Sequence, residues 1–71
     1  MRVYRANKKF GQRIQKIRKG LKISQEELAA RVGIHRNHMG RIERGETNPP
    51  IPLIEKIAKE LKVKASELLP F

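Results

Sequence analysis

The side chains best suited to chemistry lie in one short segment, residues 36–44, which mixes arginine and asparagine with apolar residues. At about 100° per residue along a helix, Met39 and Ile42 point to one side of this segment. The opposite side gathers the polar residues and one glycine: Asn37, Gly40, Arg41 and Arg44. Arginine can form two hydrogen bonds with guanine, and asparagine can do so with adenine. The segment therefore carries groups that can bind base edges, and neighbouring helices must support it because it buries little apolar surface.

Two other kinds of site have weaker support in the sequence. His35 and His38 could face a metal ion, but no cysteine or aspartate is nearby to complete a ligand set, so we predict no metal site. We expect His35 to cap the following helix and His38 to flank the core or touch a phosphate. Ser24 and Ser66 lack a base and an orienting group, which favours roles at helix ends. With no aspartate, no cysteine and no phosphate-binding glycine loop, the chain is not expected to be an enzyme or to hold a cofactor.

The net charge of +10 is concentrated in one part of the chain. Residues 1–44 hold thirteen lysines and arginines against three glutamates, whereas residues 45–71 hold four lysines against four glutamates. A one-sided positive field attracts a polyanion because contact with phosphates releases condensed counterions. A polyanion rich in phosphate is therefore an expected partner. Four lysines could equally be a solvated face or a source of general phosphate attraction: Lys8, Lys9, Lys16 and Lys19.

The length of seventy-one residues predicts one domain, residues 1–71. A single core of this size rarely supplies more than about 3–5 kcal/mol, which favours help from a second subunit. The absence of cysteine excludes disulfides and fits a reducing compartment. No apolar run approaches the roughly 18 residues of a membrane span, and the first ten residues lack the apolar stretch of a signal peptide. We therefore expect a cytoplasmic protein without a membrane partner.

Apolar residues recur at helical spacing along the whole chain, and no stretch alternates long enough to predict a strand. The predicted fold class is all-α, with five helices at about residues 7–19, 25–32, 36–44, 52–61 and 65–69. In the first helix Asn7 is the expected N-cap and Gly20 the expected stop. The apolar face of this helix would contain Phe10, Ile14, Ile17 and Leu21. The fourth helix would use Ile51, Ile54, Ile57, Ala58 and Leu61.

The second helix has the clearest local signals. Ser24 and Glu27 have the spacing of a capping box, and Ile23 can pack on Leu28 as a hydrophobic staple. Gly33 can adopt the left-handed conformation that ends a helix. The short turn that follows would join this helix to the segment at 36–44.

Two helices joined by so short a turn can meet at a steep angle only where their contact is small. Ala29 allows a close approach and Gly33 allows a positive φ at the corner, while Val32, Met39 and Ile42 would form the small core between the helices. The full pattern is Gln25-x3-Ala29-x3-Gly33-x5-Met39-x2-Ile42, followed by Glu43-Arg44-Gly45.

At these residues the sequence resembles the phage-repressor and Cro-like (Xre-type) helix-turn-helix family, whose members are compact five-helix, lambda-repressor-like domains that bind DNA operators. The segments SQEELAARVG and RIERGETNP carry the likeness, which extends from about Phe10 to Leu69. The step Gly33-Ile34-His35-Arg36 also resembles controller proteins of restriction-modification systems.

The resemblance implies a role for several residues, with the third helix in the major groove. Base contacts would come from Arg36, Asn37 and Arg41. Phosphate contacts would come from Lys22, Gln25, Arg44, Gly45 and Asn48. Arg18 and Glu43 would form an internal ion pair, and a dimer interface would use Leu68, Leu69 and Phe71, although Leu68 could instead complete the core of the monomer. Gly40 departs from the usual side chain; close approach of DNA and drift at an exposed site are equally good explanations.

We therefore expect a transcriptional regulator, repressor or activator, that binds as a homodimer to a pseudo-palindrome with half-sites about 34 Å apart. The alternative is an antitoxin or adaptor whose main partner is a protein and whose DNA binding serves autoregulation. A basic amphipathic membrane binder is disfavoured by the capped helices and by Glu43.

Overall fold

The computed structural model describes residues 2–69 of the chain, with side chains from residue 7 onward. It contains five helices: α1 (Arg2–Gly20), α2 (Gln25–Val32), α3 (Arg36–Glu43), α4 (Ile51–Glu60) and α5 (Ala65–Leu68). Within the described part there is no strand, so the predicted all-α fold class is confirmed. None of the helices between residues 2 and 69 has the length and apolar character needed to cross a bilayer.

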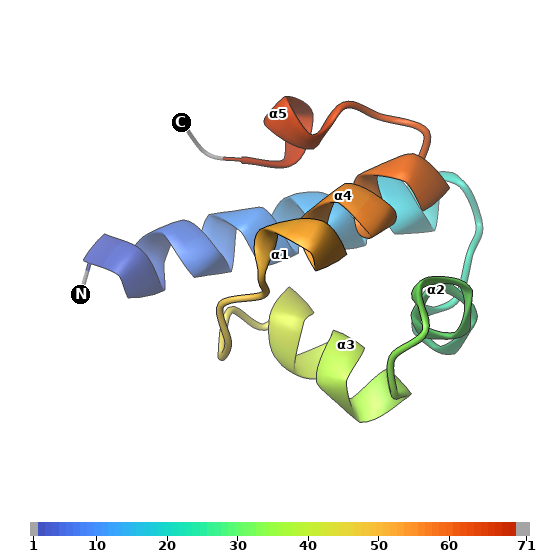
Figure 1. Ribbon diagram of the computed structural model, residues 1–71, viewed down its shortest axis with the longest axis horizontal. Helices are drawn as coiled ribbons and strands as arrows, with labels where there is room; N and C mark the ends of the chain where they lie inside the picture. The colour runs from blue at the N-terminus through green and yellow to red at the C-terminus, as the bar shows by residue number, and fades with distance from the viewer. Residues whose placement is uncertain (1, 70–71) are drawn as a thin grey trace.

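The helices surround one core. Figure 1 shows α3 at one edge of the molecule and α5 at the opposite edge, with α1 and α4 between them. α3 packs against α1 and α2, while α5 packs against α1 and α4. Every helix contributes to the buried set, which is Phe10, Ile14, Leu28, Ala29, Val32, Met39, Ile42, Leu53, Ile57, Ala58, Leu61 and Leu68.

The first helix ends at Gly20 as expected, but it begins earlier than expected and Leu21, which follows it, is exposed. It begins at Arg2, so Asn7 lies inside the helix and does not cap it. The residues before Asn7 include no glycine or proline that would prevent a helix. At the other end, Lys22 adopts the left-handed conformation (φ 59°), and the N–H of Ile23 donates to the carbonyl of Arg18 at 3.1 Å. The chain therefore leaves the helix axis after Gly20, and Leu21 is 41% exposed rather than buried.

The fourth helix buries a different residue from the one expected. Ile51, its first residue, is 70% exposed, whereas Leu53 is buried. Leu53, Ile57 and Leu61 recur at intervals of four and lie along the contact with the core, and Ile51 falls at the edge of that stripe.

The two ends of α2 and the start of α3 have the expected local chemistry. The N–H of Glu27 donates to Ser24 Oγ at 2.9 Å and the N–H of Ser24 donates to Glu27 Oε1 at 3.4 Å, which completes the capping box. Gly33 ends α2 with φ 80°. His35 caps α3, because its Nδ1 accepts the N–H of Asn37 at 3.0 Å.

Gly11 allows α1 to cross α3 at short range, a role that the sequence reasoning did not identify. A Cβ atom at Gly11 would lie 2.5 Å from the carbonyl oxygen of Glu43 and closer still to that of Ile42. Both neighbours are backbone atoms, which cannot rotate away as a flexible side chain can. The two helices can therefore keep this distance only if residue 11 has no side chain.

We predict that Gly11→Ala destabilises the protein by about 1–3 kcal/mol through overpacking, even though alanine favours helix by about 1 kcal/mol. Urea denaturation followed by circular dichroism measures the change. Gly20→Ala is the matched control, since a Cβ atom there meets nothing within 4 Å. Equal stability of the Gly11→Ala variant and the wild-type protein would contradict the steric argument.

Candidate nucleic-acid interface

α3 presents one face to solvent and packs the other into the core. Met39 and Ile42 have no exposed surface, as the spacing predicted. Arg36, Asn37 and Arg41 are all exposed on the opposite face. The three side chains that the family resemblance assigns to base contact therefore lie together, outside the fold and on one helix.

A shallow hollow of about 420 Å³ lies within this face. Residues from α2, from α3 and from the position after α3 line it: Gln25, Arg36, Asn37, Gly40, Arg41 and Arg44. The structure thus brings two of the expected phosphate-binding residues, Gln25 and Arg44, next to the expected base-binding residues.

The other expected phosphate contacts are placed differently. Lys22 is exposed in the turn after α1. Asn48 is exposed, but it lines a separate apolar groove between α1, α4 and α5. Gly45 is buried, and its N–H donates to the carbonyl of Ile42 at 3.1 Å.

The amides near Gly45, for which the resemblance implies a phosphate contact, already have partners within the protein. The N–H of Glu46 donates in turn to the carbonyl of Arg41 at 2.9 Å, so both amides close the C-terminal end of α3. This end also carries the negative pole of the helix dipole, which repels an anion. Gly45 instead serves packing: its φ is +77°, and a Cβ atom would lie 2.6 Å from the Cα of Lys8.

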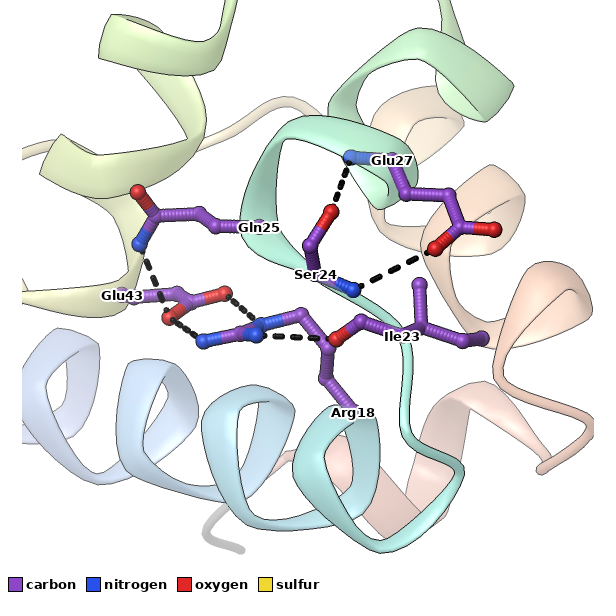
Figure 2. Close-up of polar contacts among 6 residues, drawn as sticks. All are labelled: Arg18, Ile23, Ser24, Gln25, Glu27 and Glu43. Atoms are coloured by element: carbon purple, nitrogen blue, oxygen red, sulfur yellow. Dashed lines mark hydrogen bonds and ion pairs between the residues drawn. The ribbon is translucent and has the colours of Figure 1, made fainter.

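A buried polar cluster holds α3 in place (Figure 2). Glu43 is 5% exposed and accepts from Arg18 twice, from Nε at 2.7 Å and from Nη2 at 3.0 Å. The Nη1 of Arg18 donates to the carbonyl of Ile23 at 2.9 Å. Among the described residues, no buried side-chain nitrogen or oxygen lacks a partner. The structure thus contains the Arg18–Glu43 pair that the resemblance implies, fully hydrogen-bonded.

The same cluster orients Gln25. Its Nε2 donates to Glu43 Oε1 at 3.1 Å. A carboxylate only accepts, so the amide must turn its nitrogen toward Glu43 and its oxygen toward α3. Residues from α1, α2 and α3 are joined in this way through one carboxylate.

Arg44 has an acidic neighbour on the protein itself. Its Nε donates to Glu46 Oε2 at 2.7 Å and its Nη2 donates to Oε1 at 3.2 Å. The hydrogen bond from Arg44 lowers the pKa of the Glu46 carboxyl below its usual value, and Glu46 raises the pKa of Arg44. Both side chains are exposed, so salt weakens the pair. A DNA phosphate that binds Arg44 must compete with this carboxylate.

The residues expected at a dimer interface divide into three cases. Leu68 has no exposed surface, because its side chain fills the core of its own subunit, so it is not available to a partner. Leu69 is half-buried and lines the apolar groove of about 590 Å³ together with Phe10 and Ile51. Phe71 lies outside the described residues.

The geometry of α2, the turn at Gly33 and the exposed α3 is that of a helix-turn-helix. The helix-turn-helix family model matches residues 14–68. The control protein C.BamHI from Bacillus amyloliquefaciens is 43% identical over 63 residues, which are 87% of this chain and 78% of the relative. The chain belongs to the helix-turn-helix family, a family of DNA-binding transcriptional regulators.

The solved structures with a similar fold include two regulators. The restriction-modification controller protein C.AhdI from Aeromonas hydrophila has a TM-score of 0.85 and 38% identity, covering 89% of this chain and 96% of that one. SinR, named as the master regulator for biofilm formation and solved in complex with DNA, has a TM-score of 0.78 and 38% identity. That match covers 83% of this chain and 95% of the other.

The burial of the Arg18–Glu43 pair leads to a prediction about the stability of the protein. Glu43→Ala would leave the charge of Arg18 buried without a carboxylate, at a cost of about 3–5 kcal/mol, which is comparable to the whole stability of a chain this short. We expect this variant to be largely unfolded at 25 °C by circular dichroism. The exposed pair Arg31–Glu27 (3.0 Å) is the control, and Glu27→Gln should cost less than about 1 kcal/mol. A well-folded Glu43→Ala variant would show that the pair does not hold α3.

Proposed function

We propose that this protein is a transcriptional regulator that binds double-stranded DNA sequence-specifically, as a homodimer on a pseudo-palindromic operator. The observation that carries the proposal is the division of α3: Met39 and Ile42 are fully buried, while Arg36, Asn37 and Arg41 are exposed on one face. A helix held in this way can enter the major groove without disturbing the core.

In this proposal the exposed face of α3 recognises the bases. Arg41 and Arg36 each carry donors that suit guanine, and Asn37 suits adenine. Lys22, Gln25 and Arg44 bind phosphates and set the position of the protein on the duplex, with Asn48 at the margin. The concentration of positive charge in residues 1–44 supports the same orientation, since these residues include all of α3.

The dimer is supported by the apolar groove between α1, α4 and α5. The groove holds about 590 Å³, and its apolar lining includes Ile51, which is 70% exposed. A second copy that covered Leu69 and Ile51 would remove this apolar surface from water and add stability to a small core. C.BamHI and C.AhdI, both named as control or controller proteins, favour the regulator over the antitoxin or adaptor.

Selection of bound sequences from a random DNA pool, followed by footprinting, tests the proposal as a whole. We expect two symmetric half-sites about 34 Å apart.

Arg41→Ala should relax the preference at one symmetric base position, at a cost of about 1–3 kcal/mol. Lys22→Ala should weaken all sequences alike and reduce the salt slope by about 1. Equal losses on every sequence for Arg41→Ala would exclude base recognition by this residue.

The dimer has its own test. Ile51→Lys places a charge in the groove without disturbing the core, so it should shift the protein from dimer to monomer in sedimentation and weaken binding to the symmetric operator. Leu21→Lys is the matched control, because Leu21 is exposed but lies outside the groove. If the wild-type protein stays monomeric and binds a single half-site, the groove does not form a homodimer interface. That result would favour the alternative, an antitoxin or adaptor that binds a different protein through this groove.

A further inference from the structure

Gly40 occupies the centre of the exposed face of α3, yet it is itself buried. Arg44 and Gln25 cover it: a Cβ atom there would lie 3.1 Å from Arg44 Nη1 and 3.4 Å from Gln25 Oε1. Glycine inside a helix is costly, and here it leaves a gap that any other residue would fill. Drift at an exposed position does not account for this placement.

The gap is the floor of the 420 Å³ hollow already described. Around it stand four long or polar side chains of the recognition face: Arg36, Asn37, Arg41 and Arg44. Positions 36, 37, 40, 41 and 44 form one stripe along the helix, and residue 40 is its midpoint. A group that reaches the floor must therefore approach the middle of the helix rather than its ends.

The chemistry of the hollow combines donors with an acceptor. The arginines at the rim only donate, but the amide of Gln25 turns its oxygen toward Gly40 because Glu43 holds its nitrogen. A phosphate offers acceptors alone, so it can bind the second N–H of Gln25 but gains nothing from the amide oxygen. The major-groove edge of a base pair offers both acceptors and an amino donor.

We propose that the hollow receives the major-groove edge of a base pair, and that Gly40 determines specificity because it has no side chain. The proposal rests on the proposed function and adds a residue to it. Because residue 40 has no side chain, the helix backbone can come closer to a base edge on the groove floor than a larger residue would allow.

Gly40→Ala tests the proposal on the full chain with the selected operator and a random duplex. We expect operator affinity to fall at least about fivefold, while affinity for the random duplex and the salt slope stay within about twofold of wild type. The thermal midpoint should not fall, and alanine can raise it by up to about 4–8 °C. Gly20→Ala is the matched control, with open space around its Cβ atom, and should leave operator affinity unchanged.

Because the new methyl group would touch Arg44, a second variant separates the two effects. In an Arg44→Ala background, Gly40→Ala should cause the same fold-loss on the operator as in the wild-type background. No loss in that background would overturn the proposal, since Gly40 would then act only by making room for Arg44.

The remaining outcomes are equally decisive. Operator affinity within twofold of wild type for Gly40→Ala would show that the hollow is not occupied. Equal losses on operator and random duplex would assign the hollow to a phosphate and overturn the base-edge proposal. Failure of the wild-type protein to select any sequence would instead refute the proposed function, and is seen before any variant is compared.

Discussion

The structure depends on one buried ion pair. Arg18 and Glu43 lie 7% and 5% exposed, and each must be fully hydrogen-bonded because an unpaired charge in a core this small would unfold it. The two hydrogen bonds from Arg18 to Glu43 fix the last turn of α3 against α1, and a third hydrogen bond to Glu43, from Gln25, connects α2. α3 contributes only Met39 and Ile42 to the apolar core, so hydrophobic contact alone would leave its rotation and tilt poorly defined. The carboxylate defines them.

Because buried contacts hold α3 in place, the side chains on its exposed face are free to contact a ligand. The crossing at Gly11 and the contact between Gly45 and Lys8 bring backbone against backbone, so the helix is held close without side chains from its exposed side. A helix supported mainly by its outer residues could not offer them to a ligand without losing stability. Here the residues that bind DNA in the proposal and the residues that hold the helix are different sets, except for Gln25, which belongs to both.

The sequence predicted what depends on near neighbours. The capping box at Ser24, the left-handed Gly33 and the inward Met39 and Ile42 follow from local spacing, and the structure contains all of them. The sequence-based prediction was wrong or incomplete where the burial of a residue depends on a distant contact or on a turn of the chain. Leu21 continues the helical spacing but follows the point where the chain turns. The close approach at Gly11 involves residues about thirty positions away, and no local signal marks it.

The distribution of acidic residues completes the argument for the face of α3. In the described part of the chain up to residue 46, every glutamate lies beside an arginine: Glu26–Arg36 at 3.8 Å, Glu27–Arg31, Glu43–Arg18 and Glu46–Arg44. These pairs reduce the self-repulsion that a charge of +10 imposes on a small domain. Within residues 7–69, Arg41 forms no such pair. If the proposed function holds, Arg41 has no carboxylate to release before it meets a base, whereas Arg44 exchanges Glu46 for a phosphate. In the proposed function, the phosphate contact at the edge is therefore exchangeable, whereas the base contact at Arg41 has no competing carboxylate among residues 7–69.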